Sequence, residues 1–157
     1  MKRIKVLIAD SNHLLKEDHI DGLSQSEGVE IVGITDTAHK LFELIGMRKP
    51  EIVLIDTGLH DGGDAHILTE ILNIFPRVRC IAMVRDTVLE YNSFESIAAG
   101  AAGLLVNDTT PNELLDSIKI VHEGGAILSP KIVPAFFEEF KGLVRKKYKK
   151  VKEIESK

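Results

Sequence analysis

Two aspartates stand directly after strand-like apolar runs and are the residues of this sequence best placed to do chemistry. Asp10 follows the run 4–9, and Asp56 follows the run 52–55. A carboxylate at the mouth of a buried strand can bind a hard metal ion or act as a nucleophile toward a phosphoryl group. Only one acid ends the first run, because Ser11 comes next. The sequence therefore raises the question of whether this acidic site is complete.

The elements that must position these acids follow from the apolar pattern. Short, nearly continuous runs rich in Val and Ile recur at 4–9, 29–34, 52–55, 80–84 and 103–106. Such runs are typical of strands buried on both faces of a parallel sheet, and amphipathic helical patterns lie between them. The alternation predicts an α/β fold, a flavodoxin-like (βα)5 doubly wound parallel sheet of order 2-1-3-4-5, with an extra helix at the C-terminal end.

In such a sheet a functional site lies beyond the carboxyl ends of the strands. The residues that should meet there are Asp10, Ser11, Asp56, Gly58, Arg85 and Asn107. Arg85 suggests a sharper hypothesis, because a guanidinium can bridge two carboxylates. We expect it either to hold Asp10 and Asp56 together in place of a metal ion or to point to solvent.

The C-terminal segment has a different character. We divide the chain into a domain over 1–125 and a connector with a basic helix over 126–157. Residues 141–157 carry eight Lys/Arg and two Glu, whereas the whole chain has a net charge of −4. The apolar positions of this helix are expected either to pack on the domain or to begin a dimer seam; they are Phe136, Phe137, Phe140 and Leu143. For the basic tail we favour a solvated linker over a nucleic-acid contact.

Composition limits the remaining possibilities. The chain has 157 residues, of which 44% are hydrophobic and 28% charged, as expected for one globular domain. The single cysteine excludes a disulfide within the chain. No apolar stretch reaches the roughly 18 residues of a membrane span, and the run after Met1 is too short for a secretory signal. We therefore expect a cytoplasmic location and no membrane partner.

The order and spacing of several motifs resemble the receiver domains of two-component response regulators, most closely those of the NarL/FixJ type. The resemblance covers about residues 2–130 and rests on the segments 4–10, 29–33, 50–56, 99–103 and 129–130. It implies that Asp56 occupies the phosphoacceptor position. It also implies Mg²⁺ as a cofactor, held by Asp10, Asp56 and the backbone carbonyl of Gly58. The implied partners are a histidine kinase or another regulator, a second copy in a possible homodimer, and DNA only through a domain not present in this chain.

The sequence departs from the family pattern at two positions before the fifth strand. Ser11 stands where the family has its second acid. Arg85 stands where the family has a Thr or Ser that bonds the phosphoryl group. A shift of two residues would place Thr87 there instead, but the element lengths fit without it.

Two further departures fall in the fifth strand and the residue after it. Asn107 stands where the family has a lysine, and no register repairs this, because no Lys occurs between Lys49 and Lys119. Leu104 stands where the family has an aromatic residue.

Three functions are compatible with these residues. The first is an atypical receiver, not an enzyme, that takes part in phosphorelay-type signal transduction and transcription control through protein–protein contacts, with weak or no phosphorylation. The second is a phosphorylation-competent receiver that uses Asp56 with Mg²⁺ and an altered site. The third is a flavin-binding or other flavodoxin-like enzyme, which the lack of a phosphate-binding loop at residues 10–14 argues against.

Overall fold

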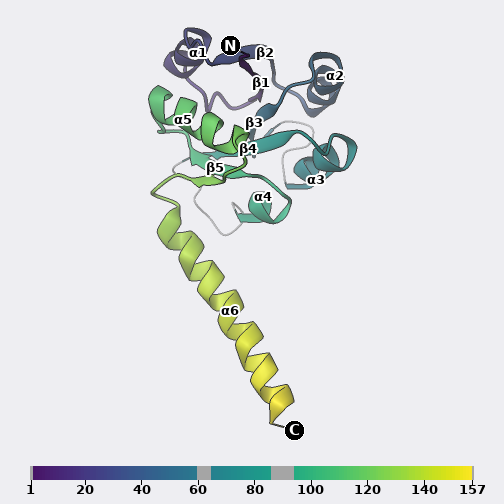
Figure 1. Cartoon of the computed structure of the whole chain (residues 1–157), viewed down its shortest axis with the longest axis vertical. Helices are drawn as coiled ribbons and strands as arrows, with labels where there is room; N and C mark the ends of the chain where they lie inside the picture. Colours follow the sequence, from purple (N-terminus) through teal and green to yellow (C-terminus); the bar gives the residue numbers. More distant parts are fainter. Residues whose placement is uncertain (1, 60–64, 86–93, 157) are drawn as a thin grey trace.

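The computed structural model describes residues 2–59, 65–85 and 94–156. A parallel sheet of order β2-β1-β3-β4-β5-β6 forms the centre (Figure 1). Its strands are β1 (Ile4–Ala9), β2 (Val29–Thr35), β3 (Ile52–Asp56), β4 (Arg79–Val84), β5 (Gly103–Val106) and β6 (Ile127–Leu128). The helices are α1 (Glu17–Ser24), α2 (Ala38–Arg48), α3 (Ala65–Ile74), α4 (Glu95–Ala98), α5 (Pro111–His122) and α6 (Val133–Glu155). The predicted α/β class and the order of the first five strands are confirmed.

The sixth strand was not predicted. Ile127 pairs with Gly103 and Leu128 with Leu104, both in parallel register. The sequence pattern places this stretch in a connector, because two residues are too few to show the period of a strand. The segment that leads into α6 is therefore tied to the sheet by backbone hydrogen bonds.

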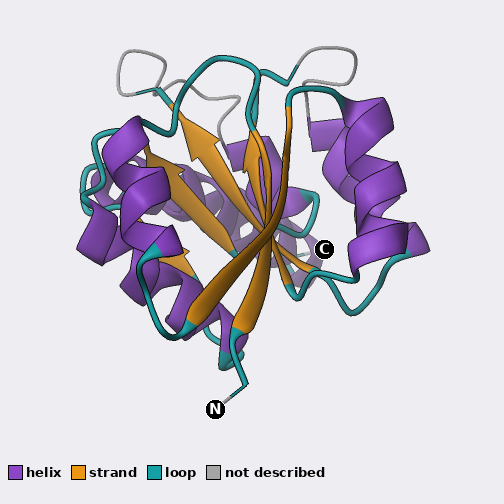
Figure 2. Cartoon of the chain, turned by 90° about the horizontal axis from the view of Figure 1, so that it is seen from above, coloured by secondary structure: helices purple, strands orange, loops and turns teal. Residues whose placement is uncertain are grey.

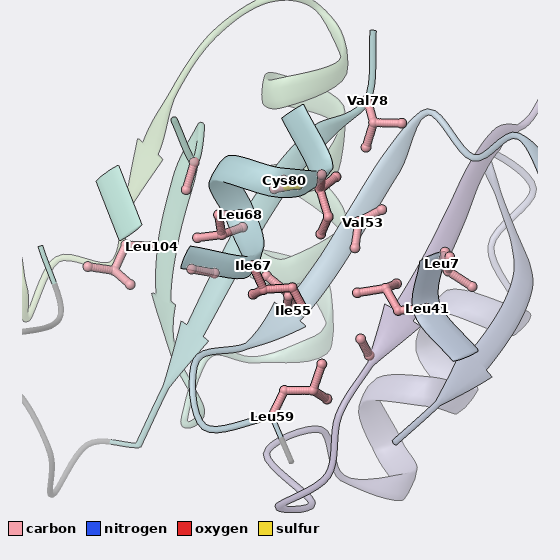
Figure 3. Packing of buried hydrophobic residues seen from close by; sticks show 14 of the residues in the cluster. Leu7, Leu41, Val53, Ile55, Leu59, Ile67, Leu68, Val78, Cys80 and Leu104 are labelled. Carbon is pink, nitrogen blue, oxygen red and sulfur yellow. The ribbon is translucent and has the colours of Figure 1, made fainter. Parts of the chain in front are cut away.

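Both faces of the sheet are covered, which explains why its strands are continuous apolar runs. Helices lie on either side of the twisted sheet (Figure 2). Along β1, Leu7 belongs to the core cluster that includes Leu41 of α2, whereas Val6 and Ile8 belong to the cluster that includes Ile118 of α5. Alternate side chains of a strand point to opposite faces, so burial on both faces requires apolar residues at every position. Figure 3 shows the first cluster.

The single cysteine lies inside this core (Figure 3). Cys80 of β4 is fully buried, and burial raises the pKa of its thiol to about 12. We expect iodoacetamide at pH 8 to label it only after denaturation, which mass spectrometry can measure. In the alkaline range the unfolded chain releases the thiol proton while the folded chain keeps it, so Cys80 should lower the free energy of unfolding as the pH rises from about 9 to about 12. Cys80→Ala should lose this part of the pH dependence, and rapid labelling of the native protein would contradict the buried position.

The helix α6 extends away from the rest of the molecule (Figure 1). It is 23 residues long, and none of its residues is buried. No helix among the described residues combines the length and the apolar character that crossing a bilayer requires.

Candidate functional site

Asp10 organises the loop that leaves the sheet after β1. Its carboxylate accepts hydrogen bonds from the backbone N–H groups of Leu14 at 3.1 Å, of Leu15 at 2.9 Å and of Asn12 at 3.3 Å. Both carboxylate oxygens are used, Oδ1 by Leu14 and Asn12, and Oδ2 by Leu15. The loop is tight enough to hold His13 at a φ of 54°. Asp10 thus supplies the acceptors that the backbone of this turn needs.

Asp56 ends β3 and is buried, with 4% of its surface exposed. Its Oδ1 accepts from the backbone N–H of Gly58 at 2.8 Å. Its Oδ2 accepts from the backbone N–H of Asn12 at 3.1 Å and from the side-chain Nδ2 of Asn12 at 2.7 Å. The loops after β1 and β3 are therefore joined through this carboxylate.

Asn12 is the residue that sequence reasoning missed. Its Nδ2 donates to Oδ2 of Asp56 at 2.7 Å and to the backbone carbonyl of Gly58 at 2.8 Å. An amide NH₂ has two donor hydrogens, and both neighbours can only accept, so the orientation of the amide follows from its partners. The Asp56 carboxylate and the Gly58 carbonyl are two of the three ligands that the resemblance assigned to Mg²⁺, and Asp10 is the third. One side-chain amide thus stands where the sequence predicted a cation.

Gly58 permits this close approach. A Cβ atom at position 58 would lie 2.9 Å from Nδ2 of Asn12 and 3.5 Å from Oδ1 of Asp56. A larger residue would push the amide away from both oxygens. The sequence did offer one signal for Asn12: it lies two residues after an acid in a loop, where Asx side chains often bond to nearby backbone.

The residues present do not fit Mg²⁺ in this arrangement. Mg²⁺ needs oxygen ligands at about 2.0–2.1 Å in octahedral geometry. Two of the expected ligand oxygens are bonded to the amide of Asn12, and the carboxylate of Asp10 is engaged by backbone N–H groups. Across residues 2–59, 65–85 and 94–156, no group of three or more His, Cys, Asp or Glu is arranged to hold a metal ion. The implied magnesium site therefore disagrees with the geometry of this chain.

Arg85 reaches the same edge of the sheet and contacts the loop that follows β1. Within the described part of the chain, its guanidinium donates to the backbone carbonyl of Asn12 and not to either carboxylate. Of the two alternatives for Arg85, the bridge between Asp10 and Asp56 is not formed among the described residues, and the guanidinium contacts a backbone carbonyl instead. Oδ2 of Asp56 accepts from the backbone N–H and the side-chain amide of Asn12 instead.

Of the other predicted positions, some lie at the edge of the sheet and one lies in the hydrophobic core. Ser11 is half-buried beside Asp10, and the backbone N–H of Asn107 donates to Val84 at 2.9 Å, at the end of β4. Leu104 is fully buried and belongs to the main core cluster, so it is a packing residue. Thr87, the alternative to Arg85, lies outside the described residues.

The phenylalanine cluster of α6 is divided between two environments. Phe136 is half-buried, lines an apolar hollow with Ile97 and Ile127, and meets Phe94 edge to face at 5.7 Å between ring centroids. Phe137 and Phe140 are each 53% exposed, and Leu143 is 66% exposed. Phe136 therefore packs on the domain, and the other three side chains are exposed.

The sequence of this chain is similar to those of several bacterial transcriptional regulators. No protein-family model matches the chain. It is 28% identical over 125 residues to the transcriptional regulatory protein YxjL of Bacillus subtilis, covering 80% of this chain and 57% of that protein. It is 24% identical over 143 residues to the DNA-binding transcriptional activator DevR/DosR of Mycobacterium tuberculosis, covering 91% and 65%. The chain thus spans less than two thirds of the length of these relatives.

Solved structures agree with these relatives. A two-component response regulator of the LuxR family from an Aurantimonas species has a TM-score of 0.76 at 20% identity, with 88% of this chain and 98% of that chain covered. The signal receiver domain of response regulator NarL from Mycobacterium tuberculosis has a TM-score of 0.68 at 22% identity, with 79% and 99% covered. The fold is therefore that of a response-regulator receiver domain. The chain is thus similar in sequence to transcriptional regulators and similar in fold to the receiver domains of response regulators.

Proposed function

We propose that this chain is the receiver domain of a two-component-type response regulator that signals through protein–protein contacts without phosphorylation of Asp56. One observation supports the proposal above all others: the amide of Asn12 is hydrogen-bonded to both Asp56 and the Gly58 carbonyl. The pocket that the resemblance assigns to a metal ion and a phosphoryl group is satisfied by the chain itself.

The state of the Asp56 carboxylate explains why phosphoryl transfer should fail. A carboxylate attacks phosphorus with an oxygen lone pair, so that oxygen must be accessible. Oδ2 of Asp56 accepts two hydrogen bonds from Asn12, and Oδ1 accepts one from Gly58. These bonds stabilise the anion and cover it, and both effects reduce its nucleophilicity.

The charges around the pocket point the same way. A phosphoryl group on Asp56 would bring additional negative charge near Asp10. The family's lysine position is occupied by neutral Asn107, and the guanidinium of Arg85 is bonded to the carbonyl of Asn12. The neutral side chain of Asn107 cannot offset that charge as a lysine would.

The same proposal covers partners and location. The relatives' names describe transcriptional regulators, and one neighbour is a structure of RcsB dimers bound to DNA, with a TM-score of 0.75 at 15% identity. By analogy we assign this chain a histidine kinase or another regulator as a protein partner, DNA only through a domain outside these residues, no enzymatic activity and a cytoplasmic location. The division into a receiver domain over 1–125 and a connector with helix over 126–157 belongs to the same proposal.

Incubation with acetyl phosphate and Mg²⁺ followed by intact-mass spectrometry tests the proposal. We expect no gain of one phosphoryl mass in the wild type, in Asp56→Ala, or in either after longer incubation. A phosphorylation-competent receiver treated in parallel shows that the reagent works. A labile phosphoryl gain in the wild type that Asp56→Ala abolishes would instead establish the second function, a competent receiver with an altered site.

A further inference from the structure

We propose that two copies of this chain associate through α6 as a parallel two-stranded coiled coil. The proposal concerns a surface that the receiver pocket does not use. Beyond its first turn, the helix exposes a row of large apolar side chains, with exposed fractions of 53% for Phe137, 53% for Phe140, 48% for Val144, 45% for Val151 and 67% for Ile154. Exposed apolar patches of this kind usually mark interaction surfaces.

The spacing of this row is that of a coiled-coil seam. Its positions alternate by three and four residues, so Phe137, Val144 and Val151 take the a positions of a heptad. Phe140 and Ile154 take d positions, and Lys147 lies at the d position between them. A heptad row follows one face of a helix and is covered best by another helix with the same repeat.

Charge and side-chain type at the flanking positions favour a second copy in parallel orientation. In a parallel pair, a g residue faces the e residue of the next heptad on the partner, five positions later. Lys150 at g therefore faces Glu155 at e, and Leu143 at g faces Tyr148 at e. An antiparallel overlap of the whole seam would instead place Lys150 beside Leu143. The parallel arrangement pairs opposite charges and pairs apolar side chains with each other.

Lys147 and the basic composition set the strength of this dimer. A charged residue at d lowers stability while favouring one register, so the dimer should exchange with monomer. Residues 141–157 carry eight Lys/Arg and two Glu, so two such helices repel each other. Salt screens this repulsion, so dimerisation should strengthen as ionic strength rises. Binding of a polyanion such as DNA would weaken as salt is added. The salt dependence therefore distinguishes a second copy of this chain from a polyanion as the partner of α6.

Sedimentation velocity of the full chain gives the dissociation constant of the dimer and so tests the seam. Val144→Asp should be monomeric at concentrations where the wild type is dimeric. Val144 is half-exposed on α6, so this variant should keep the melting temperature of the domain, which circular dichroism can check.

A charge exchange tests the orientation. Lys150→Glu and Glu155→Lys should each weaken the dimer about five- to tenfold, because each converts two symmetry-related attractive pairs into repulsive ones. The double variant should return to within about twofold of the wild type. Lys149→Glu is the matched control, because it makes the same change of charge at an f position on the opposite face.

Three results would overturn the proposal. A wild type that stays monomeric at every salt concentration up to about 1 mM protein excludes a dimer of useful affinity. A dimer unaffected by Val144→Asp uses another surface. A double charge variant no tighter than either single variant excludes the parallel register. None of these results depends on whether Asp56 can be phosphorylated, so this proposal and the proposed function can fail separately.

Discussion

Replacing Asn12 by aspartate is expected to lower the melting temperature of the metal-free protein by about 5–10 °C, and Mg²⁺ should recover much of the loss. The substitution hardly changes shape but replaces two donor hydrogens with an anionic oxygen. That oxygen would face Oδ2 of Asp56 and the Gly58 carbonyl, both of which accept from Asn12 in the native protein. The pocket would then offer the carboxylate of Asp56, a new carboxylate at position 12 and the Gly58 carbonyl, which is a set of oxygen donors that suits Mg²⁺.

Thermal unfolding followed by circular dichroism, in EDTA and then in excess Mg²⁺, measures this effect. Asn12→Ala is the matched control, because it loses the same side-chain hydrogen bonds without adding a ligand. We expect it to be destabilised in both solutions, and we expect the wild type to be indifferent to Mg²⁺. An Asn12→Asp protein as stable in EDTA as the wild type would show that the amide does not occupy a cation position.

Asp10→Ala is expected to reduce the free energy of unfolding by about 3 kcal/mol. The reason is that its carboxylate accepts from the backbone N–H groups of Asn12, Leu14 and Leu15, which would lose their acceptor together. Leu14 and Leu15 are buried, so their amides would have poor access to water as a replacement. Urea unfolding followed by circular dichroism measures the change.

Asp36→Ala provides the comparison, because Asp36 is an exposed acid that follows β2 at the same edge of the sheet. Changing it should alter stability by less than about 0.5 kcal/mol. If Asp10→Ala instead raised stability, the carboxylate would act mainly through repulsion from Asp56, as expected of an acidic metal site that lacks its ion. The two variants therefore distinguish a turn anchor from a ligand.

The strand pattern was predictable because burial on both faces of a parallel sheet leaves a direct mark on the sequence. The continuous runs that end at Ala9 and Ile55 correctly placed Asp10 and Asp56 at the same edge, where Asn12 now joins them. The strand β6 left no such mark, because its two residues acquire strand character only by pairing with β5. The strands β1 and β3 can be recognised from their own residues, whereas β6 is a strand only because of its tertiary contact with β5.

The contacts within the pocket could not be predicted in the same way. A pattern of residues gives the edge at which a side chain emerges, but not the direction in which a loop folds over it. The loop after β1 turns so that Asn12 reaches Asp56, and this leaves Arg85 with the carbonyl of Asn12. Arg85 has a long side chain and a permanent charge, which made it a candidate to contact both carboxylates. The shorter side-chain amide of Asn12 fits between two acceptors instead.

The strand β6 attaches the long helix α6 to the edge of the sheet, so a small rotation at β6 moves the far end of the helix. With 23 residues at a rise of 1.5 Å each, α6 is about 34 Å long, and it begins a few residues after the two that β6 adds to the sheet. A tilt of only about 5° at this root would carry the far end through roughly 3 Å, more than half the pitch of a helical turn. Small movements of β5, β6 or the side chain of Phe136 would therefore cause larger displacements at the C-terminal end of α6. The sheet itself would not have to rearrange.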